Sequence, residues 1–66
     1  MPNKLIIEKV ETQKGIYYEV LNKKKEYLGL ISFYRDWNEY VWEQKVGIIM
    51  SASCLIELSK FMEKLK

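Results

Sequence analysis

Short runs of apolar and β-branched residues, separated by polar segments, occupy the first two thirds of the chain. The runs predict β-strands at 5–11, 16–21, 27–34 and 40–44. The polar segments between them contain turn-forming residues, at 12–15, 22–26 and 35–39. Such short intervals are typical of antiparallel strands joined by hairpin turns. Gly29, inside the third strand, indicates a bulge or a bend.

From Ser51 onward the apolar residues follow the period of an α-helix. One side of a helical projection collects the apolar side chains Cys54, Leu55, Leu58, Phe61, Met62 and Leu65. Ser51 is a suitable N-cap because its hydroxyl can accept a hydrogen bond from a free amide of the first turn. Ile56 is the exception and points to the polar side.

These elements predict a single α+β domain over residues 1–66. A four-stranded antiparallel sheet is followed by an amphipathic helix that packs on one of its faces (ββββα), which leaves the other face open. Alternation predicts a helix-facing set made of Ile16, Tyr18, Val20, Ile31, Phe33 and Val41. It predicts an open-face set made of Tyr17, Glu19, Leu21, Leu28, Leu30, Tyr34, Tyr40 and Trp42.

Composition narrows the classes of protein that this chain can represent. The 66 residues include 11 basic and 9 acidic side chains, no His and one Cys, so neither an internal disulfide nor a zinc site with soft ligands is expected. A core this small favours self-association, and we expect a homodimer. No apolar run has the length of a membrane helix, and no signal peptide is recognised, so we expect a cytoplasmic protein.

The chemistry of the chain argues against catalysis. The most common general base is missing, and the carboxylates lie among lysines on strands and turns, as on a solvated surface. Cys54 starts the helix, where a thiol can be activated, but its place in the apolar stripe favours a packed side chain. The three glycines form no phosphate-binding pattern. We expect no enzyme activity, no cofactor and no metal.

Aromatic and basic residues form the one suggestive group. Single-stranded nucleic acids are held by cations along the phosphates and by aromatic rings on which bases stack. The candidates for such contacts, or for contacts with a protein partner, are Tyr17, Tyr34, Arg35, Trp37, Tyr40, Trp42, Lys23, Lys24 and Lys25. Aromatic residues also serve as cross-strand pairs, and a net charge of +2 is low for a nucleic-acid binder. A protein-binding or dimer face is the competing interpretation.

The C-terminal half resembles a family of very short proteins encoded in phages and prophages. The similarity lies in the Trp37-Asn38-Glu39-Tyr40-Val41-Trp42-Glu43 segment, in Gly47, and in the Ser51 to Leu65 helix with its Cys54-Leu55 pair. The resemblance implies a viral or mobile-element origin and a host cytoplasm as location. In that setting the open face would bind single-stranded nucleic acid, or the protein would act as an inhibitor of a host or defence protein.

A second resemblance is to the positive-cofactor-type transcriptional coactivators, which are dimeric binders of single-stranded DNA. The Lys45-Val46-Gly47-Ile48-Ile49-Met50-Ser51 segment, leading into a helix with Leu55 and Leu58, is similar to the strand-to-helix junction of that family. This resemblance implies four strands, a C-terminal helix and dimerisation.

Overall fold

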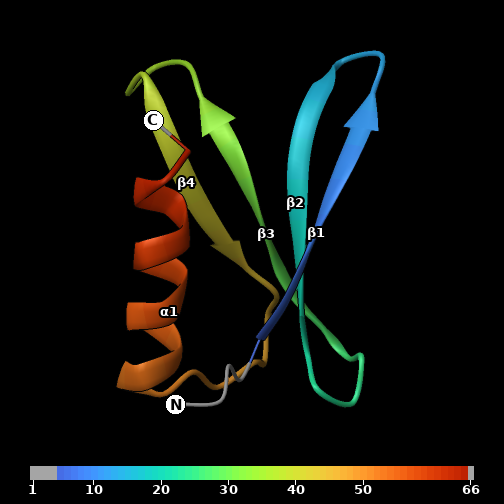
Figure 1. Cartoon of the computed structure of the whole chain (residues 1–66), viewed down its shortest axis with the longest axis vertical. Coiled ribbons are helices and arrows are strands. Elements are labelled where there is room, and N and C mark those ends of the chain that lie inside the picture. Colours follow the sequence, from blue (N-terminus) through green and yellow to red (C-terminus); the bar gives the residue numbers. More distant parts are fainter. Residues whose placement is uncertain (1–4, 66) are drawn as a thin grey trace.

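The computed structural model describes residues 5–65 and contains the four strands and the C-terminal helix (Figure 1). The strands are β1 (Leu5–Thr12), β2 (Gly15–Asn22), β3 (Tyr27–Tyr34) and β4 (Glu39–Gln44), and the helix is α1 (Ala52–Glu63). The three strand pairs are antiparallel, and the sheet order β1-β2-β3-β4 follows the chain. The predicted ββββα fold class is therefore confirmed.

The turns are made by residues that suit their backbone conformations. Gly15 closes the first hairpin with a φ of 136°, which residues with a side chain rarely adopt. In the second turn the side-chain oxygen of Asn22 accepts hydrogen bonds from the amides of Lys24, at 2.9 Å, and Glu26, at 3.0 Å. Asn38 in the third turn has a φ of 56°, which asparagine tolerates better than most residues. These turns set the register of the three hairpins.

A β-bulge in β3 bends the sheet, as Gly29 indicated. Val20 of β2 pairs with Gly29, but the next residue, Leu21, pairs with Tyr27, so Leu28 is the extra residue on β3. Unbroken alternation predicts Leu28 on the open face, and that prediction is wrong because the bulge shifts the register there. Leu28 is instead buried in the core.

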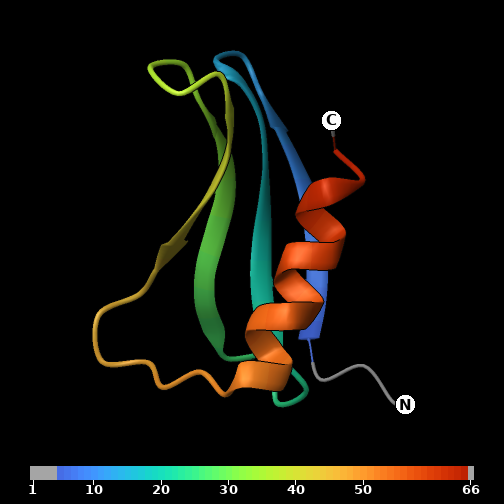
Figure 2. The ribbon, with the colours of Figure 1, turned by 90° about the vertical axis from the view of Figure 1, so that its left-hand side faces the viewer.

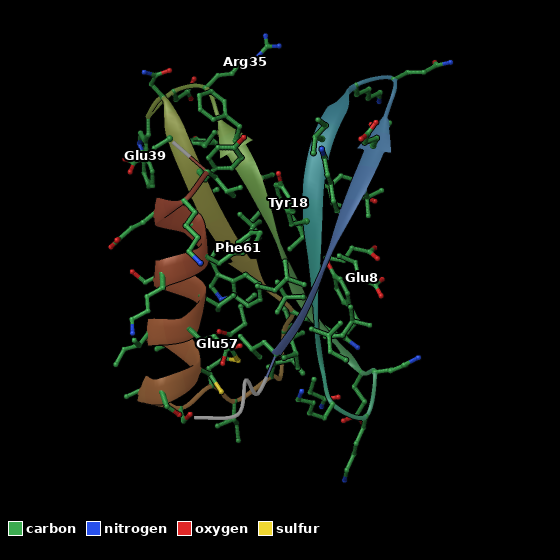
Figure 3. The ribbon with its side chains drawn as sticks, in the orientation of Figure 1. Glu8, Tyr18, Arg35, Glu39, Glu57 and Phe61 are labelled. Carbon is green, nitrogen blue, oxygen red and sulfur yellow. The ribbon has the colours of Figure 1, made fainter. Side chains whose placement is uncertain are left out.

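α1 lies across one face of the sheet and forms a second layer (Figure 2). Its N-cap is Ser51, whose hydroxyl accepts a hydrogen bond from the Cys54 amide at 3.3 Å. The centre of the core consists of the buried side chains Leu5, Val20, Leu28, Ile31 and Leu58. Beside this centre the rings of Tyr18 and Phe61 meet edge to face, with centroids 5.2 Å apart, between the sheet and the helix (Figure 3). Cys54 packs against the same cluster.

The two faces of β4 are the reverse of those predicted. Residues 35–38 form the turn, so Tyr34 pairs with Glu39 and Phe33 pairs with Tyr40. The predicted turn, 35–39, is one residue longer. Because successive side chains of a strand point to opposite faces, one residue reverses the whole strand. Tyr40 and Trp42 therefore face the helix, and Val41 lies on the open face.

Candidate functional site

The sheet face that points away from α1 is the first candidate site, and we call it the open face. Strand register places on it the side chains of Ile6, Glu8, Val10, Thr12, Tyr17, Glu19, Leu21, Tyr27, Leu30, Ser32, Tyr34, Glu39, Val41 and Glu43. None of these fourteen residues is basic, although the whole chain has more basic than acidic residues. The charge of this face is therefore opposite in sign to that of the chain.

Three glutamates form a row across the open face. Glu8 pairs directly with Glu19, and Leu30 pairs with both Glu19 and Glu43. Side chains that oppose each other in this way have Cβ atoms about 4.5–5.5 Å apart, and like charges there destabilise the sheet. Glu8 points away from the helix (Figure 3). Within residues 5–65 the Glu8 and Glu19 carboxylates form no ion pair, since the Lys9–Glu11 contact of 3.5 Å involves neither.

Apolar rows lie on both sides of the glutamate row. On one side Ile6 pairs with Leu21, which pairs with Tyr27. On the other side Val10 pairs with Tyr17. These five side chains are half-buried by their neighbours in the sheet, and the helix layer is on the opposite face. The open face thus combines a negative centre with apolar flanks.

The ionisation of Tyr27 reports the negative potential of this surface. Desolvation raises the pKa of Tyr27 above its ordinary value, and Glu19, Tyr17 and Glu43 raise it further. Each of these three neighbours belongs to the open face. A negative charge on the Tyr27 phenolate is therefore disfavoured beside the glutamates of the open face.

The residues predicted to bind from the sequence do not form one surface. Tyr17 and Tyr34 belong to the open face, whereas Tyr40 and Trp42 lie on the helix side of the sheet. The lysines 23–25 are in the β2–β3 turn, at the opposite end of the strands from the β3–β4 turn (Figure 1). The β3–β4 turn carries Arg35 and Trp37, and Trp37 meets the Tyr34 ring edge to face at 5.0 Å.

The glutamate row is a candidate functional feature that was not predicted from the sequence, although the signal was available. The predicted turn at 12–15 places Glu11 opposite Ile16, as observed, and counting back along both strands places Glu8 opposite Glu19. Each glutamate taken alone has the pattern of a solvated surface residue. Only cross-strand pairing brings the carboxylates together.

A second candidate site is a groove of about 730 Å³ between α1 and the β3–β4 hairpin, which we call the α1–β4 groove. Its apolar walls include Phe33, Tyr40, Trp42, Leu55, Met62 and Leu65. The charged residues that line it are Glu39 and Glu63, and no basic residue among those described does so. Glu39 pairs with Tyr34, so its side chain belongs to the open face, and Glu63 is the acidic residue of the helix wall. Glu63 ends α1, where the negative end of the helix dipole adds to the same potential.

Comparison of the chain with protein-family models, with curated proteins and with solved structures finds no match. Over residues 5–65 no helix has the length and apolar character required to cross a membrane. In the same part of the chain no group of three or more His, Cys, Asp or Glu side chains is arranged so that it could hold a metal ion. The open face and the α1–β4 groove are therefore the two surfaces from which a function can be inferred.

Proposed function

We propose that this protein is a small non-enzymatic binding module whose open face recognises a basic surface of another protein. The observation that carries the proposal is the row formed by Glu8, Glu19 and Glu43 between two apolar rows. A pair of directly opposed carboxylates costs stability, so its presence needs a compensating role. A partner that brings lysine or arginine to the row would neutralise the carboxylates and cover the apolar flanks.

The same row makes the open face a poor platform for single-stranded nucleic acid. Phosphate binding requires cations along the path of the backbone, and stacking requires aromatic rings on one accessible surface. Here the open face holds carboxylates, and its Tyr17 and Tyr34 rings are separated by the sheet from Tyr40 and Trp42. Nucleic-acid binding stays a prediction, and the geometry favours the protein-interaction hypothesis over it.

The resemblance to phage and prophage proteins suggests the setting of this interaction. In that setting the partner is a host or defence protein in the host cytoplasm, and the module acts by occupying a basic surface on it. A basic surface also attracts the phosphates of nucleic acid, so an acidic module would compete with nucleic acid for it.

A titration with model peptides tests the proposal. The probe is a synthetic peptide in which lysine alternates with valine, and the matched peptide has glutamate in place of lysine. We expect the lysine peptide to shift the NMR signals of Glu8, Glu19 and Leu30, and its affinity to fall as salt rises. The glutamate peptide and a single-stranded oligothymidylate should leave these signals unchanged.

A double variant, Glu8→Gln with Glu19→Gln, keeps the shape of the face and removes two charges. It should bind the lysine peptide at least about tenfold more weakly, as expected for lost charge complementarity. Glu11→Gln, on the same strand but outside the row, is the matched control and should retain affinity. Binding of the oligonucleotide at the open face, or equal peptide affinity of the double variant and the control, would refute the proposal.

A further inference from the structure

We propose that the β4–α1 loop of one copy of this protein docks in the α1–β4 groove of a second copy. The loop comprises residues 45–51 and carries the two most exposed large apolar side chains of the described chain, Val46 at 96% and Ile49 at 94%. Two almost fully solvent-exposed apolar side chains that lie close together in sequence are characteristic of an interaction site. In such a dimer one contact would both fill the groove and bury the exposed side chains of the loop.

The loop is held in a defined shape before any partner arrives. The Ile48 amide donates to the Lys45 carbonyl at 3.3 Å, and Gly47 has a φ of 88°, so residues 45–48 form a tight turn with Val46 at its tip. The Gln44 side-chain amide donates to the Ile48 carbonyl at 2.6 Å. The alternate residues Ile48 and Met50 pack against the core, which directs Ile49 outward. Little conformational entropy is therefore lost when this loop binds.

The loop and the groove match in chemistry. The tip offers an apolar side chain directly after Lys45, and the groove offers apolar and aromatic walls with the acidic residue Glu63 at the end of α1. The volume of about 730 Å³ lies within the range of about 300–1,000 Å³ that is usual for ligand sites. A cationic, apolar tip is therefore the kind of occupant that this groove favours.

The loop does not fill the groove of its own chain. Val46 and Ile49 are almost fully exposed, and the groove is unfilled in the same fold. The loop and groove are nonetheless linked, since the indole nitrogen of Trp42 donates to the Gln44 side chain at 3.4 Å. Trp42 lines the groove, and Gln44 holds the loop. Two copies that exchange loops would form a twofold dimer with two equivalent contacts.

This inference does not depend on the proposed function and involves a different surface. A twofold dimer through the open face would instead bring two glutamate rows together, which the repulsion between carboxylates disfavours. The sequence predicts self-association on the basis of a thin core, and the structure offers the loop and groove as the contact surfaces for it.

Sedimentation of the full chain over a dilution series tests the contact. We expect the mean mass to rise above 8.0 kDa toward twice that value as concentration increases. Leu55→Glu alters the groove, and Val46→Asp with Ile49→Asp alters the loop. Each of these variants should weaken association at least about tenfold. Ile56→Glu is the matched control, since Ile56 adjoins Leu55 and is 55% exposed against 46% but does not line the groove.

Mixing the two variants distinguishes loop-to-groove docking from every contact between like surfaces. The loop variant retains an intact groove and the groove variant retains an intact loop, so an equimolar mixture can form one of the two contacts. We expect the mixture to associate more strongly than either variant alone and more weakly than the unaltered protein. The Glu8→Gln, Glu19→Gln protein, altered only at the open face, should dimerise at least as well as the unaltered chain.

Three outcomes would overturn the inference. The first is a mass that stays at 8.0 kDa throughout the dilution series. The second is a dimer that the loop and groove variants do not weaken, and the third is a mixture that associates no better than its components. Circular dichroism of each variant shows whether it remains folded. Because Val46 and Ile49 are almost fully exposed, we expect the loop variant to remain folded.

Discussion

The indole ring of Trp42 lies directly over the backbone of Gly29. A Cβ atom added at Gly29 would be 2.5 Å from Cη2 of Trp42, and it would also collide with the Glu43 carbonyl oxygen. No real Cβ atom tolerates such contacts, so only glycine fits at this position of β3. Gly29 thus lets the largest side chain of β4 pack against the sheet beside the bulge.

Gly29→Ala should therefore destabilise the fold by about 1–3 kcal/mol, the usual cost of forcing extra atoms into a packed site. Chemical denaturation measures the change. In a Trp42→Leu background the same substitution should cost less, because part of the collision is with the indole ring. An equal cost in both backgrounds would show that the Glu43 carbonyl alone excludes a side chain.

The overall fold could be predicted from the sequence because its signals are local. Runs of β-branched residues identify the strands, and the spacing of Leu58, Phe61 and Leu65 identifies the helix. The faces of β4 could not be assigned, since they depend on whether Glu39 belongs to the turn or to the strand. The place of Leu28 depends on a bulge whose position no local pattern specifies.

The candidate site was less accessible to prediction than the fold. Aromatic and basic residues were the conspicuous ones, but the four-residue turn at 35–38 places Trp42 on the helix side, away from Tyr17. The carboxylates come together as a candidate site only through pairing across all four strands. The Val46 side chain was equally hard to place, because exposure within an apolar segment is decided by tertiary packing.

Glu19→Gln should stabilise the folded protein. The substitution removes the repulsion between Glu19 and Glu8, which is worth about 0.2–1 kcal/mol for directly opposed residues of a sheet. Added salt should stabilise the unaltered protein more than the variant, since it screens the same repulsion. Glu11→Gln provides the comparison, because Glu11 is paired with Lys9 at 3.5 Å and should gain nothing. Thermal unfolding that ranks the two variants the other way would contradict the repulsion.

Tyr27 should make the protein sensitive to alkali. Burial, Glu19, Tyr17 and Glu43 raise the pKa of Tyr27 in the folded state, so the folded protein holds this proton more tightly than the unfolded chain does. The resulting stabilisation is complete below the unfolded pKa of about 10 and is lost as pH rises through the higher folded pKa. The free energy of unfolding, measured from pH 8 to pH 12, should fall at the alkaline end of this range, and the fall should be smaller in Tyr27→Phe.

A spectroscopic titration separates the causes of the Tyr27 shift. Glu19→Gln removes the largest of its charge contributions and should lower the pKa of Tyr27, seen as earlier phenolate absorbance on raising the pH. Tyr27→Phe should remove this absorbance step, and Tyr34→Phe, at the β3–β4 end of the same face, is the control for the loss of one tyrosine. An unchanged titration in Glu19→Gln would mean that Glu19 makes no contribution to the shift.

The two tryptophans should respond very differently to truncation. Trp42 is half-buried against the core and covers Gly29, whereas Trp37 lies in the β3–β4 turn and is 66% exposed. Trp42→Ala should cost about 2–4 kcal/mol through lost packing, and Trp37→Ala should cost less than about 0.5 kcal/mol. Denaturant unfolding followed by circular dichroism measures both without relying on tryptophan fluorescence. A Trp42→Ala protein as stable as Trp37→Ala would contradict the placement of Trp42 on the helix side of β4. A side chain on the open face has no helix to pack against, so its truncation would cost little.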